Sequence, residues 1–218
     1  MRHKVYEYIE KFMRLEKILK RIIWKKRAFT LAEVLITLGI IGVVAAMTMP
    51  ALQTNIRRKT ASARLKTFYA NMKQMLLLAE DDYGSSANWN TRLSKAEFWD
   101  TYFLPYLKAT KSNDGSKIYF PDGSTLENFG HGSCLELKYD YNGAGGPNKW
   151  GYDAYWFVIC PTTNGGSGWC PEGFCSRRLD ADKNNRSKLL SDCRSNPSTC
   201  GGLLEYDHWK FLSDYPYK

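Results

Sequence analysis

Residues 29 to 49 form an apolar run that is interrupted by a single carboxylate, Glu33. The 21 residues of this run would rise by about 30 Å as an α-helix, which matches the hydrocarbon core of a bilayer. A charge inside such a helix costs about 2.5–3.5 kcal/mol on insertion scales, so an intramembrane carboxylate usually has a partner and a function. The run therefore predicts a membrane-spanning helix, and Glu33 is its candidate functional residue.

A basic cluster, Lys25-Lys26-Arg27, comes directly before Ala28 and the apolar run. Residues 25 to 33, Lys-Lys-Arg-Ala-Phe-Thr-Leu-Ala-Glu, resemble the N-terminal signature of type IV prepilins and type II secretion pseudopilins. The resemblance covers residues 25 to 52. It implies cleavage by a prepilin peptidase between Ala28 and Phe29, N-methylation of Phe29, and pairing of the Glu33 carboxylate with a neighbouring subunit's N-terminus. The family usually has Gly before the cut, and Ala28 is the next smallest residue.

The positive charge of the chain is concentrated before the apolar run. Residues 1 to 28 hold ten Lys or Arg and three Glu, so this leader carries +7 of the chain's net charge of +9. Such a distribution predicts that the N-terminus stays in the cytoplasm and that the C-terminal part is periplasmic. It does not indicate a nucleic-acid-binding surface.

Basic residues lie on both sides of the apolar run. Apolar residues at helical spacing in the leader suggest a basic amphipathic helix on the anionic inner leaflet, but an over-extended gene start would explain the leader as well. Arg57, Arg58 and Lys59 follow the run. We interpret this basic triplet as a solvated or lipid-headgroup collar.

An ordinary signal peptide is the alternative for residues 29 to 49. A small-residue cut site exists at Val43-Val44-Ala45-Ala46, and its cleavage would release a soluble domain. The apolar stretch is long for a signal peptide, and Glu33 would be a needless penalty in a discarded segment. Processing of the prepilin type is therefore favoured.

The helix is expected to continue past Pro50 to residue 82. Pro50 cannot donate to the helix ladder, so it should kink or locally melt the helix. Beyond it, apolar residues recur at steps of three and four, and basic residues fall between them. The expected divisions are a leader at 1–28, a transmembrane helix at 29–50, an amphipathic continuation at 51–82 and a globular head at 83–218.

The head is expected to combine short helices with a small sheet. Residues 87 to 110 suggest one or two helices whose aromatic residues Phe98, Trp99, Tyr102 and Phe103 enter the core. From residue 117 onward, short apolar runs alternate with turn residues, which predicts strands at 117–121, 134–139, 155–160 and 209–212. The predicted fold class is α+β and pilin-like, with a long N-terminal helix packed on a small antiparallel sheet.

All cysteines lie in the head, which suggests disulfides in an oxidising compartment. The six are Cys134, Cys160, Cys170, Cys175, Cys193 and Cys200. Six cysteines allow 15 pairings. Short loops favour Cys170–Cys175 and Cys193–Cys200, which leaves Cys134–Cys160. Zinc is the rival interpretation, but Cys-x-x-Cys spacing and clustered histidines are missing.

One loop concentrates oxygen ligands. Asp140, Asn142 and Asp153 surround glycine-rich turns and resemble the start of a calcium loop, although the twelfth position holds Gly151 instead of the Glu of an EF-hand. Some major pseudopilins hold calcium in a sheet loop, and by that resemblance these three residues are the candidate ligands. Ordinary turn chemistry of Asn, Asp and Gly is the favoured explanation, and no other cofactor is expected.

These observations predict a structural subunit and no enzyme, because the sequence contains no recognisable activated nucleophile or acid–base pair. By the resemblance, the protein would be a type II secretion pseudopilin in the bacterial inner membrane. Its partners would be the prepilin peptidase, other pilin-like subunits and the membrane, with no nucleic acid. The alternatives are a minor type IV pilin for adhesion or DNA uptake, and a membrane-anchored binding module that does not polymerise.

Overall fold

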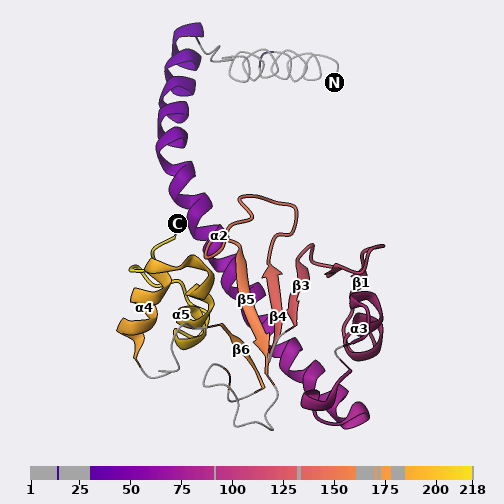
Figure 1. The fold of residues 1–218 in the computed structure, drawn as a ribbon. Coiled ribbons are helices and arrows are strands. Elements are labelled where there is room, and N and C mark those ends of the chain that lie inside the picture. Colours follow the sequence, from indigo (N-terminus) through magenta and orange to yellow (C-terminus); the bar gives the residue numbers. More distant parts are fainter. Residues whose placement is uncertain are drawn as a thin grey trace, which may run out of the picture. The chain divides into compact units, whose positions relative to one another are not determined.

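A computed structural model describes residues 30–90, 92–131, 134–160, 170, 173–177 and 185–217, together with Arg14. The remainder of the leader, with the predicted cleavage residues Ala28 and Phe29, lies outside the described residues. The chain divides into two compact units with a boundary after Leu52. The long helix α2, Leu31–Tyr83, contributes to both units (Figure 1).

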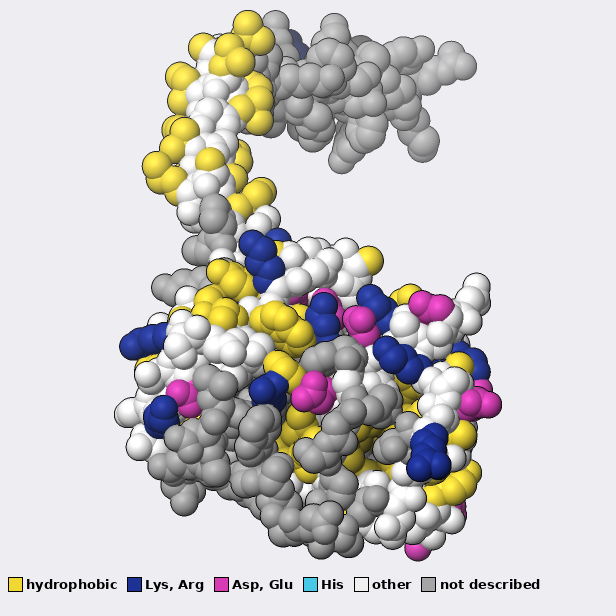
Figure 2. Space-filling view, viewed as in Figure 1, with side chains coloured by type: hydrophobic (Ala, Val, Ile, Leu, Met, Phe, Trp, Pro, Cys, Tyr) yellow, Lys and Arg dark blue, Asp and Glu magenta, His cyan; other side chains and the backbone are white. Residues whose placement is uncertain are grey.

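The first part of α2 is apolar and exposed. Within the described residues, α2 is the single helix long and apolar enough to span a membrane by length and composition, and its most apolar stretch is not buried in the protein (Figure 2). The hydroxyl of Thr37 donates to the Glu33 and Val34 carbonyls, and that of Thr48 to the Val44 carbonyl. Both polar side chains are thus satisfied inside the helix, as a lipid environment requires.

The helix assignment runs through Pro50 without a break. The locally melted turn that we considered for this position is therefore not seen. A bend of the helix axis at Pro50 stays a prediction. The helix ends at Tyr83, one residue beyond the expected end, and Gly84 follows it with a φ of 76°. A positive φ is readily adopted only by glycine, which explains why the helix stops there.

After α2, the head consists of a six-stranded sheet flanked by short helices. The elements are η1 Ser86–Asn88, α3 Lys95–Tyr102, β1 Thr110–Lys111, β2 Lys117–Tyr119, β3 Thr125–His131, β4 Leu135–Asp140, β5 Ala154–Ile159, β6 Phe174–Ser176, α4 Arg186–Ser195, η3 Pro197–Thr199 and α5 Cys200–Tyr206. Every strand pairs antiparallel with its neighbours in the order β1-β2-β3-β4-β5-β6. The expected α+β fold, with a long helix packed on an antiparallel sheet, is confirmed.

The second part of α2 packs on one face of the sheet. Leu65, Phe68 and Met72 are buried, and the Phe68 ring stacks on Tyr139 of β4 with centroids 3.8 Å apart. The ring of Phe157 in β5 meets Phe68 edge-on at 5.0 Å. Tyr139 and Phe157 point to the same face because residues on adjacent strands alternate in step.

The sheet's other face carries a smaller apolar cluster that includes two disulfides. Val158 alternates with Phe157 along β5 and packs with the buried sulfurs of Cys160, Cys170 and Cys175. Cys134 and Cys160 form one disulfide and Cys170 and Cys175 another. The Cys134–Cys160 disulfide follows from the register of β4 and β5. Leu135 pairs with Ile159 across β4 and β5, so the next residues outward, Cys134 and Cys160, face each other.

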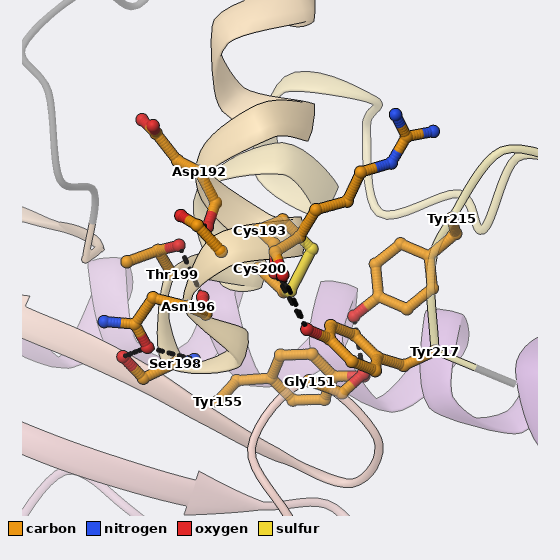
Figure 3. Close-up of a disulfide and its surroundings, with 12 residues drawn as sticks. Gly151, Tyr155, Asp192, Cys193, Asn196, Ser198, Thr199, Cys200, Tyr215 and Tyr217 are labelled. Atoms are coloured by element: carbon orange, nitrogen blue, oxygen red, sulfur yellow. Dashed lines mark hydrogen bonds between the residues drawn. A yellow bond between two sulfur atoms is a disulfide. The ribbon is translucent and has the colours of Figure 1, made fainter.

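The third disulfide, Cys193–Cys200, ties α4 to the first residue of α5. Figure 3 shows it beside Tyr217, whose hydroxyl donates to the Cys193 carbonyl at 3.1 Å. Arg186 joins this region to the chain end, because its guanidinium donates to both Asp207 and Asp214. Two of the three pairings, Cys170–Cys175 and Cys193–Cys200, are those that the short loops favoured, and Cys134–Cys160 is the pair that these left.

The strand predicted at 209–212 is wrong. His208 and Trp209 both have a positive φ, which no strand residue adopts, and the Trp209 carbonyl accepts a bond from the Ser62 hydroxyl of α2. The Trp209 ring is buried against Tyr69 and Phe157. The Trp209 ring therefore enters the core, and its segment does not extend the sheet. The sequence interpretation also missed α4 and α5, because it predicted no element between the strands at 155–160 and 209–212.

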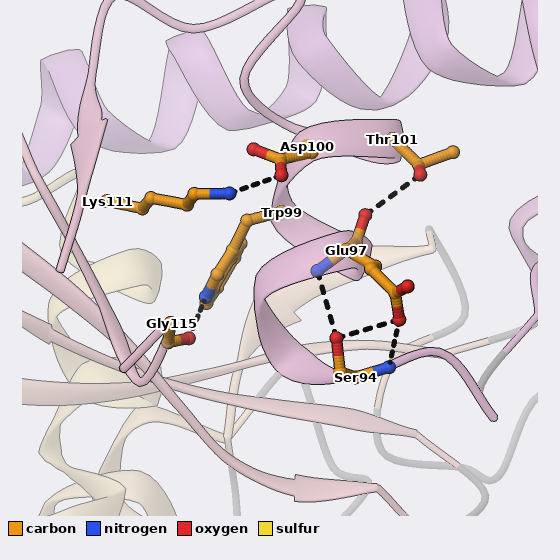
Figure 4. Close-up of polar contacts among 7 residues, drawn as sticks. All are labelled: Ser94, Glu97, Trp99, Asp100, Thr101, Lys111 and Gly115. Atoms are coloured by element: carbon orange, nitrogen blue, oxygen red, sulfur yellow. Dashed lines mark hydrogen bonds and ion pairs between the residues drawn. The ribbon is translucent and has the colours of Figure 1, made fainter. Parts of the chain in front are cut away.

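The α3 region agrees with the prediction of a helix whose aromatic residues enter the core. Phe98, Trp99, Tyr102 and Phe103 are all buried. Ser94 and Glu97 form a reciprocal capping box at the start of α3, and the Trp99 indole donates to the Gly115 carbonyl at 2.9 Å (Figure 4). A polar N–H in the core is thereby satisfied, as burial of tryptophan requires.

Candidate functional site

The first turn of α2 positions Glu33. Its Oε2 accepts hydrogen bonds from the Thr30 backbone N–H at 2.9 Å and from the Thr30 hydroxyl at 3.0 Å. The Glu33 N–H donates back to the Thr30 hydroxyl at 3.2 Å. These contacts form a capping box in which Thr30 is the residue before the helix and Glu33 lies three residues later. Glu33 is therefore held in a defined geometry before any partner binds.

Thr30 is a residue that the sequence interpretation missed. The Thr-x-x-Glu spacing before an apolar run is the usual signature of a capping box and would have identified it. The donors that Thr30 supplies are neutral, so they orient the Glu33 carboxylate without cancelling its charge. In a low-dielectric environment, this charge still requires a cation nearby. The site can therefore hold a positive group next to the start of α2.

The predicted calcium residues lie together at the connection between β4 and β5. Asp140 is the last residue of β4, and its Oδ1 accepts the backbone N–H groups of Asn142 and Gly143 at 3.2 and 2.9 Å. The two carboxylate oxygens of Asp153 accept the N–H groups of Asn148 and Lys149 at 2.8 and 2.7 Å. Asp140 thus shapes its own turn, as Asx-type turns do, and Asp153 accepts from residues that precede it in the loop.

Three further oxygens of this loop face the Asn148 side chain. In the orientation that satisfies its neighbours, the Asn148 amide nitrogen donates to Asp140 Oδ2 at 3.2 Å and to the carbonyls of Gly143 and Gly145 at 2.9 and 2.8 Å. The amide thus occupies the centre where these oxygens converge. Asn142 Oδ1 is buried and has no hydrogen-bond partner among the described residues. In this arrangement the carboxylate oxygens of Asp140 and Asp153 are used within the turn, and calcium binding at Asp140, Asn142 and Asp153 stays a prediction.

Burial has an electrostatic consequence at Asp140. Loss of hydration raises the pKa of this carboxyl from 3.8 to about 6; Asp153 adds to the effect, while the N–H groups of Asn142 and Gly143 oppose it. The native state therefore binds the proton more tightly than the unfolded chain. The contribution of Asp140 to the free energy of unfolding is largest below about pH 4 and falls as the pH rises to about 6.

We expect Asp140→Asn to flatten the pH dependence of stability between pH 4 and pH 6. The wild-type free energy of unfolding should lose about 2 kcal/mol more than that of the variant across this window, since the slope approaches 1.36 kcal/mol per pH unit only between the unfolded pKa of 3.8 and the folded pKa of about 6. Urea unfolding at several pH values measures the difference. Parallel pH profiles for the two proteins would show that Asp140 is ionised normally in the fold.

Two family models match the chain. The model described as "Prokaryotic N-terminal methylation motif" matches residues 25–49, which contain Glu33 and the predicted cleavage point. The model described as "Family of unknown function (DUF6613)" matches residues 51–218, more than half of the chain. Comparisons with curated proteins and with solved structures found no match. The methylation motif confirms the prepilin-like N-terminus, and the chain belongs to the family of unknown function DUF6613.

Proposed function

We propose that this protein is a structural subunit of a type II secretion pseudopilus, without enzymatic activity. The observation that supports it is the arrangement of the first helix. A methylation-type N-terminus precedes an exposed apolar helix, and the same helix continues into a disulfide-linked head. The compact head, whose basic and acidic side chains are mixed over the visible face, fits a periplasmic filament subunit (Figure 2).

The proposed mechanism is assembly. A prepilin peptidase cuts between Ala28 and Phe29, and the new Phe29 amine carries a positive charge. The Glu33 carboxylate of an adjacent subunit pairs with this amine, because a paired charge costs far less than an unpaired one in a low-dielectric environment. The exposed side chains of Leu35, Ile36 and Ile40 then leave the lipid and pack among like helices in the filament core.

The first test is the N-terminus of the mature protein. Membrane-extracted protein, co-expressed with a prepilin peptidase, is expected to begin at N-methylated Phe29 in intact-mass and N-terminal sequencing measurements. Ala28→Gly should process at least as fast, because it restores the family's usual residue. A soluble species that begins near Met47 would mean ordinary signal cleavage and would refute the assembly mechanism.

The second test assigns the filament. Deletion of the gene is expected to abolish secretion of folded periplasmic proteins and to leave surface pili, adhesion and DNA uptake unchanged. The reverse pattern would assign the protein to a type IV pilus as a minor pilin. If the anchored protein is found only as isolated subunits, the non-polymerising binding module is the correct function.

A further inference from the structure

A basic pocket opens in the head unit beside the start of its α2 segment. Its volume is about 650 Å³, and its walls include Arg57, Arg58 and Arg64 of α2, with Tyr141, Tyr152 and Tyr217 from the head. None of its lining residues is an aspartate or a glutamate. The pocket therefore concentrates positive charge next to aromatic surface, a combination that selects an anionic ligand.

The three guanidinium groups differ in how much of their hydrogen-bonding capacity is used. Arg64 donates to the Tyr141 carbonyl and lies 3.8 Å from an Asp122 oxygen. Arg58 is different, because its Nε and Nη2 are buried and have no hydrogen-bond partner in the described part of the chain. An orphaned buried donor of a charged group is costly, so a ligand that accepts from Arg58 is strongly favoured. Arg57 is exposed and also lines the pocket.

The adjoining turn carries two carboxylates that are not part of the pocket lining. Asp140 and Asp153 accept backbone N–H groups of the turn, which orient their oxygens and leave their charge in place. The buried Arg58 donors, which these carboxylates do not accept from, are therefore what an external anion would satisfy. Phosphate, with several oxygens, can accept from more than one guanidinium at once.

Chain connectivity indicates where the anion comes from. Thr54, the first residue that lines the pocket, follows Met49 at the end of the apolar run by five residues, and five residues of helix rise by about 7.5 Å. A distance of this size corresponds to the headgroup layer beside the hydrocarbon core. We propose that the pocket binds the phosphate of an anionic phospholipid headgroup from the membrane that α2 spans. The proposal rests on the membrane anchoring included in the proposed function.

Such a contact has a physical role in assembly. A headgroup held by Arg57 and Arg58 fixes the depth of the head unit at the membrane surface before the subunit is extracted from the bilayer. Extraction of the subunit from the bilayer then requires release of the lipid. The affinity of the pocket for the lipid therefore affects how readily a subunit enters the filament. Lys59 is also exposed and basic, but it does not line the pocket. It therefore provides a control of equal charge on the same helix.

The test uses the full mature chain in an uncharged detergent and three probes. These are short-chain phosphatidylglycerol, short-chain phosphatidylcholine and inorganic phosphate, each titrated while the thermal unfolding midpoint is recorded. Phosphatidylglycerol is expected to raise the midpoint. Arg58→Gln and Arg57→Gln should each weaken its apparent affinity by about tenfold or more, the size expected for a lost charge-assisted hydrogen bond. Lys59→Gln should leave it unchanged.

Three results would overturn the proposal. Both lipids carry a phosphate, so equal effects of phosphatidylglycerol and phosphatidylcholine would show that the pocket does not select an anionic headgroup. An equal loss in Lys59→Gln would show unspecific charge attraction. An equal shift with inorganic phosphate alone would assign the pocket to a free anion instead of a lipid. Arg57 is exposed, so its variant keeps the test valid if Arg58→Gln fails to fold. Processing at Phe29 is measured separately, so failure here is distinguishable from failure of the proposed function.

Discussion

Subunits with Glu33→Ala are expected to accumulate in the membrane and to be almost absent from filaments. Without the carboxylate, the Phe29 amine of the neighbouring subunit stays uncompensated in the filament core. An unpaired charge there costs about 3–5 kcal/mol, which corresponds to a loss of at least a hundredfold in incorporation. Quantitative blotting of sheared filament and membrane fractions measures the effect. The N-terminus is sequenced in the same samples, so defective cleavage is not mistaken for defective assembly.

The capping box provides controls that separate charge from helix geometry. Gln at position 33 can still accept from Thr30 but carries no charge, so Glu33→Gln should fail to assemble like Glu33→Ala. Thr30→Val removes the hydroxyl and keeps the Glu33 charge, so it should assemble. If Glu33→Gln assembles normally and Thr30→Val does not, Glu33 acts as a helix cap and the charge-pairing mechanism is wrong.

Phe68→Ala is expected to destabilise the head by about 3–5 kcal/mol, the usual cost of removing a buried phenylalanine ring. Phe68 lies at the centre of the contact between α2 and the sheet, where its ring meets Tyr139, Phe157 and Phe174. Its loss leaves a cavity between α2 and the sheet. Urea unfolding of the full chain in mild detergent, followed by tryptophan fluorescence, measures the change.

Leu77→Ala is the matched control on the same helix. Leu77 is 69% exposed, so its truncation should change the free energy of unfolding by less than about 0.5 kcal/mol. A similar cost for the two variants would mean that α2 does not dock on the sheet through the Phe68 face. Little effect of Phe68→Ala would mean that the head unit is stable without this contact.

Local signals in the sequence predicted the elements that depend on neighbouring residues. The apolar run, the three- and four-residue periodicity after Pro50 and the Tyr83-Gly84 stop together predicted α2 almost to the residue. The short loops indicated the Cys170–Cys175 and Cys193–Cys200 disulfides, because residues close in sequence pay little loop entropy on pairing. The same reasoning could have found Thr30, whose capping role depends only on Glu33 three residues later.

The sequence by itself determined the anchor, the helix and the disulfide-rich α+β character, because each depends on short-range spacing and composition. Only the tertiary structure decided the rest. Trp209 is a residue type that is common in strands. Its ring is instead packed against Tyr69, and its carbonyl accepts a hydrogen bond from Ser62. Arg58 and Tyr217 line the same pocket although they are far apart in the chain. Such long-range proximity depends on how the whole core packs.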